Sequence, residues 1–378
     1  MNILFVSELW VVPWGGSEEL WSLAAFRMAE AGHRVSALVH KREKPVVRLA
    51  QLSAAGCRID HYRSRPDIRP SLPARIGRRV LRLFSEQTSL TKSLQISKPD
   101  LVVVSLNFFT EGFEDLKSCR VHGVPYIIIV QSASLHLYMN DDLRDEYRTV
   151  YSGALMCCFV SEGNRRDVET CFGQRLHNAR VVRNPFNVPY DSAPSWPAKE
   201  DVIRLACVGR LDPDAKGQDI LFNVLARSVW RDRPLTVSLV GKGSSEKTLR
   251  RLAQMYGIAD RVQFQGYASD IVDVWSRHHA LVLPSRFEGL PLAVVEAMLC
   301  GRICIVTDIA GNKELIEDNC TGFVATAPAP DLVDEAMERA WRRRDEWQDM
   351  GRAAAQSVRK NVPSDPVADF VSLVTSMR

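Results

Sequence analysis

The sequence predicts an α/β protein of two doubly wound, Rossmann-like domains. Three observations support this: short apolar runs alternate with helical patterns, the alternation starts again after a proline-rich stretch, and 378 residues suit two or three domains. Strands that alternate with helices form parallel βαβ units, and their strands are buried on both faces. Ligands of such sheets bind beyond the carboxyl ends of the strands, so we expect functional residues in the loops that follow strands.

The first half begins with the apolar run NILFVS at 2–7, which predicts a buried strand rather than a signal peptide because no basic segment precedes it. A helix is expected over 18–31, where Leu20, Ala24 and Met28 recur at helical spacing. Further strands are expected at 34–39, 101–104, 126–130 and 154–160.

Residues 184–200 (NPFNVPYDSAPSWPAKE) hold four prolines, which suit neither a helix nor a central strand. This stretch is therefore the expected linker between a first domain, 1–184, and a second, 185–363. The final segment, 364–378, has apolar residues at helical spacing. In the second half, strands are expected at 204–208, 235–240, 262–265, 280–283, 303–306 and 322–325.

Composition excludes several classes of protein. With 46% apolar and 25% charged residues the chain is neither disordered, a coiled coil nor collagen-like, and no apolar run is long enough to span a membrane. A net charge of +4 gives no indication of nucleic-acid binding. The nine cysteines are scattered without a C-x-x-C pair, so we expect reduced, buried thiols in a cytosolic protein and no zinc site.

The most informative stretch is LVLPSRFEGLPLAVVEAMLCG at 281–301. It predicts a strand, a loop that contains Glu288 and a helix that contains Glu296. The two carboxylates then lie on either side of a helix N-terminus, where free N–H groups and the helix dipole favour an anion. A diphosphate bound there would leave a carboxylate on each side for hydroxyl groups, which matches the shape of a nucleotide-sugar. The alternative is a solvated loop residue and an ordinary helix-face charge.

A second stretch, CVGRLDPDAKGQDIL at 207–221, places Arg210 and Lys216 after a strand. Both side chains suit phosphate binding, although two solvated surface cations are the alternative. Between them, Asp212 and Asp214 form a D-x-D pattern that we interpret as a turn rather than a metal site. A third stretch, VGKGSSE at 240–246, lacks the third glycine of a dinucleotide fingerprint and predicts only a tight loop near the ligand.

Together these stretches resemble the retaining glycosyltransferases of family 4, the E-x7-E enzymes also described as glycosyl transferases group 1, which have the GT-B fold. FEGLPLAVVEAM matches the signature, VGRLDPDAKGQDIL matches the phosphate-binding loop, and PWGGSEELWSLAAFRMAEAGHRVSALV is similar to the N-terminal Gly-Gly loop and first helix. The resemblance implies two Rossmann-like domains that face each other across a cleft, with the last helix crossing back to the first domain.

The resemblance also implies roles for individual residues. Glu288 would bind hydroxyls of the donor sugar, Glu296 would bind the ribose, and Arg210 and Lys216 would neutralise the diphosphate as it leaves. No metal or other cofactor is then needed, because the cations and the helix dipole stabilise the leaving group. Further donor-binding positions implied by the resemblance are Gly16, Gly241, Tyr267, Gly289, Leu290 and Leu292.

One position departs from the family pattern. Where the family commonly has a histidine that reaches the donor sugar, this chain has Gln131, which can donate a hydrogen bond but cannot act as a proton carrier near pH 7. His136 is a candidate substitute, and Asn107 lies in a neighbouring loop of the expected acceptor wall. The departure bears on which sugar is used.

A basic stretch at 63–82 contains seven arginines and one aspartate. It predicts an amphipathic helix that either lies on an anionic membrane through Arg75, Arg78, Arg79 and Arg82 or packs its apolar face on the domain core. The first reading places the protein in the cytoplasm, peripheral on the inner face of the membrane.

We therefore expect a retaining, metal-independent transferase that moves a hexose-type sugar from a UDP- or GDP-sugar to a hydroxyl of a glycan or lipid-linked glycan, in polysaccharide or glycoconjugate synthesis. The alternatives are a nucleotide-sugar epimerase of the same fold and an inactive sugar-nucleotide-binding protein.

Overall fold

The computed structural model describes residues 1–10, 14–62, 89–135, 139–198 and 201–377. These residues form two compact units. The first comprises Met1–Val160, Arg165–Asn184 and Pro366–Arg378, and the second comprises Ser161–Asn164 and Pro185–Asp365. Each unit is built around a parallel sheet of its own.

The sheet of the first unit has seven parallel strands in the order β3-β2-β1-β4-β5-β6-β7. The order reverses between β1 and β4, which is the topological switch point of a doubly wound sheet. The strands are β1 (Asn2–Ser7), β2 (Arg34–Val39), β3 (Arg58–His61), β4 (Leu101–Leu106), β5 (Tyr126–Val130), β6 (Met156–Phe159) and β7 (Ala179–Val181).

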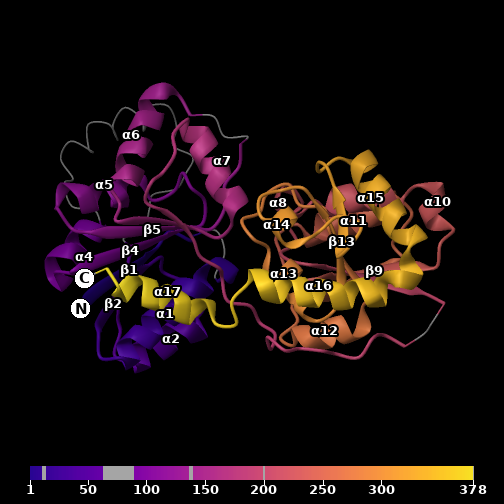
Figure 1. Cartoon of the computed structure of the whole chain (residues 1–378), viewed down its shortest axis with the longest axis horizontal. Coiled ribbons are helices and arrows are strands. Elements are labelled where there is room, and N and C mark those ends of the chain that lie inside the picture. The colour runs from indigo at the N-terminus through magenta and orange to yellow at the C-terminus, as the bar shows by residue number, and fades with distance from the viewer. Residues whose placement is uncertain (11–13, 63–88, 136–138, 199–200, 378) are drawn as a thin grey trace. The chain divides into compact units, whose positions relative to one another are not determined.

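Helices cover both faces of this sheet. The C-terminal helix α17 (Pro366–Thr375) packs against α1 (Glu19–Glu30), and the two lie side by side in Figure 1. The other helical elements of the unit are η1 (Gly16–Glu18), α2 (Val47–Ala54), α4 (Ser89–Ser97), α5 (Phe113–Val121), α6 (Asp141–Ser152) and α7 (Glu162–Phe172), of which α7 begins in the segment that groups with the second unit.

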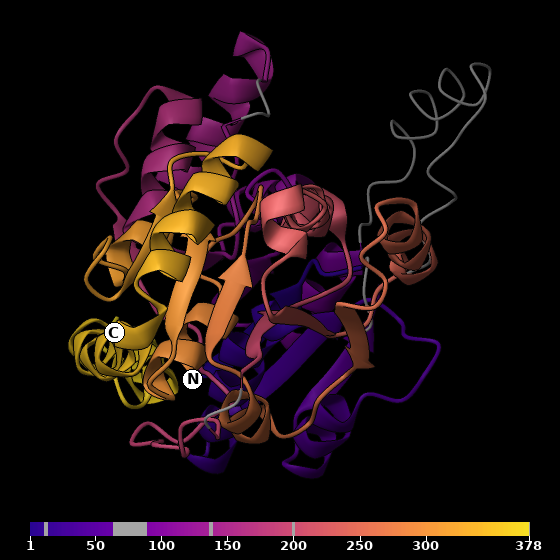
Figure 2. The same cartoon turned by 90° about the vertical axis from the view of Figure 1, so that its right-hand side faces the viewer.

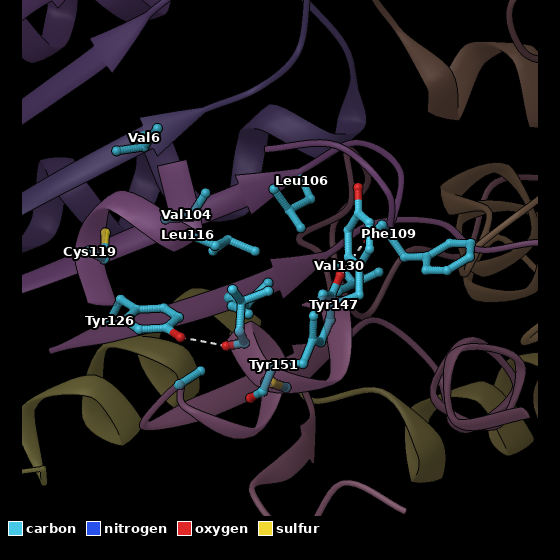
Figure 3. Packing of buried hydrophobic residues seen from close by; sticks show 14 of the residues in the cluster. Val6, Val104, Leu106, Phe109, Leu116, Cys119, Tyr126, Val130, Tyr147 and Tyr151 are labelled. Atoms are coloured by element: carbon cyan, nitrogen blue, oxygen red, sulfur yellow. Dashed lines mark hydrogen bonds between the residues drawn. The ribbon is translucent and has the colours of Figure 1, made fainter. Parts of the chain in front are cut away.

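Successive residues of each strand point to opposite faces of the first sheet, so they pack into two hydrophobic layers, one on each face. Figure 3 shows one layer, in which strand side chains such as Val104 and Val130 lie among aromatic residues. Tyr126 and Tyr151 are buried there, and their hydroxyls donate to the backbone carbonyls of Val150 and Phe109. Their polar tips are thus satisfied inside an apolar layer.

The second unit has six parallel strands in the order β10-β9-β8-β11-β12-β13, with its switch point between β8 and β11. In Figure 2, helix α15 lies along strands β12 and β13. The strands are β8 (Ile203–Val208), β9 (Leu235–Val240), β10 (Val262–Gly266), β11 (Ala280–Leu283), β12 (Ile303–Thr307) and β13 (Gly322–Ala325). The helices are α8 (Pro213–Lys216), α9 (Gln218–Leu225), α10 (Ser228–Arg231), α11 (Glu246–Met255), α12 (Ile271–Arg277), α13 (Leu292–Leu299), α14 (Asn312–Leu315), α15 (Pro330–Arg342), η2 (Arg344–Glu346) and α16 (Trp347–Asn361).

The predicted fold class is confirmed, since both units are doubly wound α/β sheets. Two edge strands, β3 and β7, were not expected from the sequence because they are short and only partly buried. The expectation of nine buried cysteines is wrong at Cys320, which is exposed in the turn before β13, whereas the other eight are buried free thiols. None of the described helices is long and apolar enough to cross a membrane.

Candidate functional site

The switch point of the second unit gathers the strongest sequence motifs. The loop 209–217 follows β8, and the loop 284–291 follows the neighbouring strand β11 and leads into α13. Because parallel strands end at the same edge of a sheet, the two loops lie beside each other there. Arg210 and Lys216 come from the first loop, and Glu288 comes from the second.

Gly217 allows these two loops to touch. Its backbone is left-handed, with φ of 66°, and a Cβ atom at this position would lie 2.0 Å from the carbonyl oxygen of Pro284. The backbone N–H of Arg286 also donates to the carbonyl of Ala215 at 2.8 Å. Only glycine suits both the dihedral angle and the close approach.

Lys216 and Glu288 form an ion pair, with Lys216 Nζ 2.6 Å from Glu288 Oε1. Ser285 Oγ donates to the same oxygen at 2.7 Å. Glu288 is 7% exposed, and its Oε2 has no hydrogen bond to any residue in the described part of the chain. The carboxylate is therefore held in place through Oε1, which leaves Oε2 able to accept a further hydrogen bond. Burial raises the pKa of the Cys207 thiol in β8 to about 12, and the charges of Lys216 and Glu288 act on it in opposite directions.

Arg210 is more exposed than Lys216, and its guanidinium contacts Asp212 at 3.2 Å and 3.0 Å. The backbone carbonyl of Asp212 accepts hydrogen bonds from the N–H groups of Ala215 and Lys216, which start the single helical turn α8. The D-x-D pattern therefore forms a turn, as the sequence predicts. No group of three or more metal-ligating side chains occurs among the residues that the structure describes.

Glu296 is the fifth residue of α13 and is 3% exposed. Its Oε1 accepts hydrogen bonds from the backbone N–H and from the side-chain amide of Asn187, both at 2.9 Å. Burial raises the pKa of Glu296, and the two bonds from Asn187 act in the opposite direction. Asn187 was missed by sequence reasoning, which assigned its stretch to the linker and gave no signal of a partner 109 residues away.

The start of α13 adds backbone donors. Leu292 is the first helical residue, so its N–H has no intrahelical partner, and Gly289 and Leu290 precede it in the loop. The Gly289 carbonyl is fixed by hydrogen bonds from Gly311 N at 3.0 Å and Ser161 Oγ at 2.9 Å. This arrangement gives a positively polarised helix end between Glu288 and Glu296.

Two further predicted residues lie at the same edge of the second sheet. Gly241 follows β9 with φ of 147°, and a Cβ atom there would lie 2.0 Å from the Gly209 carbonyl oxygen, so only glycine lets these strand ends approach. Tyr267 directly follows β10 and is 73% exposed. The order β10-β9-β8-β11 brings these residues to successive positions along one edge.

The remaining predicted residues lie in the first unit. Gln131 follows β5, is 6% exposed, and accepts a hydrogen bond from Asn184 Nδ2 at 2.6 Å. Asn107 follows β4, and its carbonyl accepts a hydrogen bond from Ser132. Gly16 begins the short helix η1. His136 lies outside the described residues, as do Arg75, Arg78, Arg79 and Arg82.

The first unit also has a polar cluster that sequence reasoning missed. The Tyr62 hydroxyl contacts Glu8 Oε1 at 2.8 Å and also contacts Asp115, and His40 stacks on the Tyr62 ring with centroids 4.3 Å apart. Burial and the two carboxylates raise the pKa of Tyr62 well above its ordinary value. These residues come from the ends of β1, β2 and β3 and from α5, so no local sequence pattern links them.

Comparisons with known proteins agree with this architecture. Residues 191–357, most of the second unit, match the family described as "Glycosyl transferases group 1". Over its full length the chain superposes on sucrose-phosphate synthase of Thermosynechococcus elongatus with a TM-score of 0.75 and 17% identity, covering 99% of that chain. It superposes on Anabaena HepE in complex with UDP with a TM-score of 0.74 and 17% identity, covering 100% of both chains. The fold is that of the GT-B proteins.

One curated relative is the GDP-mannose-dependent alpha-(1-6)-phosphatidylinositol monomannoside mannosyltransferase of Mycobacterium tuberculosis. It is 29% identical over 253 residues, which are 60% of this chain and 64% of the relative. The chain thus spans less than two thirds of the length of that relative.

Proposed function

We propose that this protein is a retaining glycosyltransferase that moves a hexose-type sugar from a UDP- or GDP-sugar to a hydroxyl of a glycan or lipid-linked glycan. The observation that carries the proposal is the Lys216–Glu288 pair, 2.6 Å between charged atoms, beside the N-terminus of α13. A cation for phosphate, a carboxylate for hydroxyls and a helix end for an anion meet at the switch point of one sheet.

In this proposal Arg210 and Lys216 bind the diphosphate and stabilise its charge as it leaves. The N–H groups of Gly289, Leu290 and Leu292 assist at the helix end. Glu288 Oε2, which has no hydrogen-bond partner in the described residues, accepts hydrogen bonds from hydroxyls of the donor sugar.

Glu296, held through Oε1 by Asn187, binds the ribose with its second oxygen. Gly241 and Tyr267 border the nucleotide, and Gly16, Gln131, Asn107 and His136 contribute from the first unit.

The proposed stereochemistry and the proposed nucleotide are supported by the family resemblance and by what similar proteins are named to bind. Retention of anomeric configuration follows from the E-x7-E resemblance. UDP and GDP are suggested by the UDP complex of Anabaena HepE and by the GDP-mannose dependence named for the mycobacterial relative.

That relative acts on a phosphatidylinositol mannoside, which suggests a lipid-linked acceptor and a peripheral place on the cytoplasmic face of a membrane. Independence from metal is proposed because the two cations and the helix end supply the positive charge.

The test begins with thermal unfolding in the presence of UDP-, GDP-, ADP- and TDP-sugars. A ligand that binds only the native state raises the melting temperature, so one nucleotide series is expected to give a clear shift. Transfer from that donor to acceptors is then measured with and without EDTA, with no loss of rate expected in EDTA.

Glu288→Gln keeps the shape of the side chain and is expected to abolish transfer, whereas Glu317→Gln in the same unit serves as a charge-matched control. Binding of a donor without transfer to any acceptor would favour the inactive sugar-nucleotide-binding protein. If no nucleotide-sugar shifted the melting temperature, both the transferase and the inactive binding protein would be rejected.

A further inference from the structure

Arg286 lies two residues before Glu288 and has no part in the chemistry proposed above. Its guanidinium forms a two-point ion pair with Asp219, with NH1 2.7 Å from Oδ1 and NH2 2.8 Å from Oδ2. NH1 also donates to the carbonyl oxygen of Pro213 at 2.7 Å. The side chain therefore bridges from the Glu288 loop to both ends of the segment that carries Lys216.

The backbone of the same loop adds a third attachment. Arg286 N donates to the carbonyl oxygen of Ala215 at 2.8 Å, and Phe287 N approaches the same oxygen at 3.3 Å. The segment 213–219 is thus held before, beside and after Lys216. We name these contacts of Arg286 with Pro213, Ala215 and Asp219 the Arg286 clasp.

The clasp needs a guanidinium. A planar fork with several donors satisfies a carboxylate at two points and a carbonyl at a third, whereas a lysine ammonium is a single point charge. Both terminal nitrogens of Arg286 are engaged with Asp219 or Pro213. Arg286 is therefore directed at the protein rather than at a ligand.

We propose that Arg286 is a positioning residue, which holds Lys216 at the place where it meets both Glu288 and the donor diphosphate. This inference rests on the proposed function, because it assigns Lys216 to phosphate. Arg286 is 31% exposed and Asp219 is 37% exposed, and ion pairs at such exposure contribute little to global stability. Loss of the clasp is therefore expected to weaken ligand binding far more than it weakens the fold.

The experiment measures the affinity of the full-length protein for UDP and GDP by titration calorimetry. Arg286→Gln is expected to weaken binding of the preferred nucleotide about tenfold. Arg286→Lys is expected to keep only part of the affinity that Arg286→Gln loses. The charge exchange of Arg286→Asp with Asp219→Arg is expected to regain affinity relative to either single change. Arg227→Gln is the matched control, because Arg227 has the same 31% exposure and pairs with two carboxylates on α15.

A double-mutant cycle separates positioning from general damage. In a Lys216→Met background, Arg286→Gln is expected to cause no further loss, because the group that it positions is gone. Equal losses in both backgrounds would overturn the inference, as would an Arg286→Gln protein that binds as tightly as the wild type. Failure of the wild type to bind any nucleotide would instead reject the proposed function and the inference with it. Melting temperatures of all variants establish that each is folded.

Discussion

At the scale of single residues, Lys216 neutralises the buried Glu288 carboxylate and is also proposed to bind the donor diphosphate, and the two roles predict different effects of mutation. Lys216→Met would leave the Glu288 carboxylate, 7% exposed, without its cation. An uncompensated charge at such burial is costly, and we expect the free energy of unfolding to fall by about 2 kcal/mol. The double change Lys216→Met with Glu288→Gln removes both charges and is expected to regain most of this stability. Thermal or denaturant unfolding measures the effect.

Nucleotide binding should respond differently to the same variants. The double variant lacks Lys216, the cation proposed to bind the diphosphate, so it is expected to bind UDP or GDP as weakly as the single Lys216→Met variant does. Recovered stability together with lost binding would separate the two roles of Lys216. Recovery of both would show that Lys216 serves only to neutralise Glu288.

Glu18 shows how burial makes stability depend on pH. This glutamate is 1% exposed, Ser7 Oγ donates to it at 2.7 Å, and burial raises its pKa from 4.5 to about 7. Between about pH 4.5 and pH 7, Glu18 therefore keeps its proton in the folded protein and loses it in the unfolded chain. The contribution of Glu18 to stability accordingly falls as pH rises from about 4.5 to 7, by roughly 3 kcal/mol.

Glu18→Gln is expected to remove this dependence. The stability of the variant relative to the wild type should increase as pH rises through 7, as measured by urea unfolding at pH 5 and pH 8. Glu30→Gln, an exposed position at the end of α1, the helix that directly follows Glu18, changes the net charge equally and is expected to show no such trend. A constant difference between Glu18→Gln and the wild type at both pH values would contradict the expected titration.

Sequence reasoning at this scale identified residues but not their partners. Glu288 and Lys216 were each selected from a local motif, yet the 2.6 Å contact between them spans 72 positions. The bonds of Asn187 to Glu296 and of Arg286 to Asp219 are equally non-local. Such contacts depend on which strands neighbour each other, and no single motif contains that information.

At the scale of elements, the contact of Gly217 with Pro284 fixes how the loop after β8 meets the loop after β11. Gly217→Ala would place a Cβ atom 2.0 Å from a backbone oxygen, in addition to the strain of a positive φ. We expect a loss of more than about 3 kcal/mol in the free energy of unfolding. Gly257→Ala isolates the contribution of the dihedral, since Gly257 has the same φ of 66° and its nearest neighbour is the flexible Arg231 side chain at 3.7 Å.

The comparison is made by chemical denaturation of both variants. Gly257→Ala is expected to cost only about 1 kcal/mol, so the difference between the two reports the loop contact alone. Equal losses in the two variants would mean that the loops separate freely and that their contact does not stabilise the site.

Strands with a continuous apolar run were predictable from the sequence, whereas β3 and β7, the two edge strands of the first sheet, were not. β5 (YIIIV) is apolar throughout and β4 (LVVVSL) is apolar except for Ser105, and such runs are typical of a parallel sheet covered on both sides. β3 has the sequence RIDH and β7 has only three residues, so neither shows such a run. Their pairing is determined by the neighbouring strand, and a reading of local hydrophobicity misses it.

At the scale of the whole molecule, the C-terminal segment follows the second unit in the chain but belongs to the first unit. α17 is the last helix of the chain, yet it belongs to the first unit, where it packs on α1. Val367, Phe370 and Val374 are buried in the same hydrophobic layer as residues of β1 and β2. The apolar spacing of this segment was visible in the sequence, but its place came only from family resemblance, because either sheet has a face that such a helix could cover.

Phe370→Ala tests that the two units have separate cores. Truncation of a fully buried phenylalanine costs about 3–5 kcal/mol, and Phe370 is 1% exposed. Hydrogen exchange is expected to accelerate in α1, β1 and β2 and to remain unchanged in β8–β13.

Phe323→Ala is the matched experiment in the second unit, because Phe323 is 0% exposed on β13 and its loss should accelerate exchange in that unit instead. Nucleotide affinity should then fall in Phe323→Ala and persist in Phe370→Ala, since Arg210 and Lys216, the residues proposed to bind the diphosphate, lie in the second unit. If Phe370→Ala accelerated exchange equally in both units, they would unfold as one cooperative block, and the C-terminal helix would stabilise the donor site as well as its own sheet.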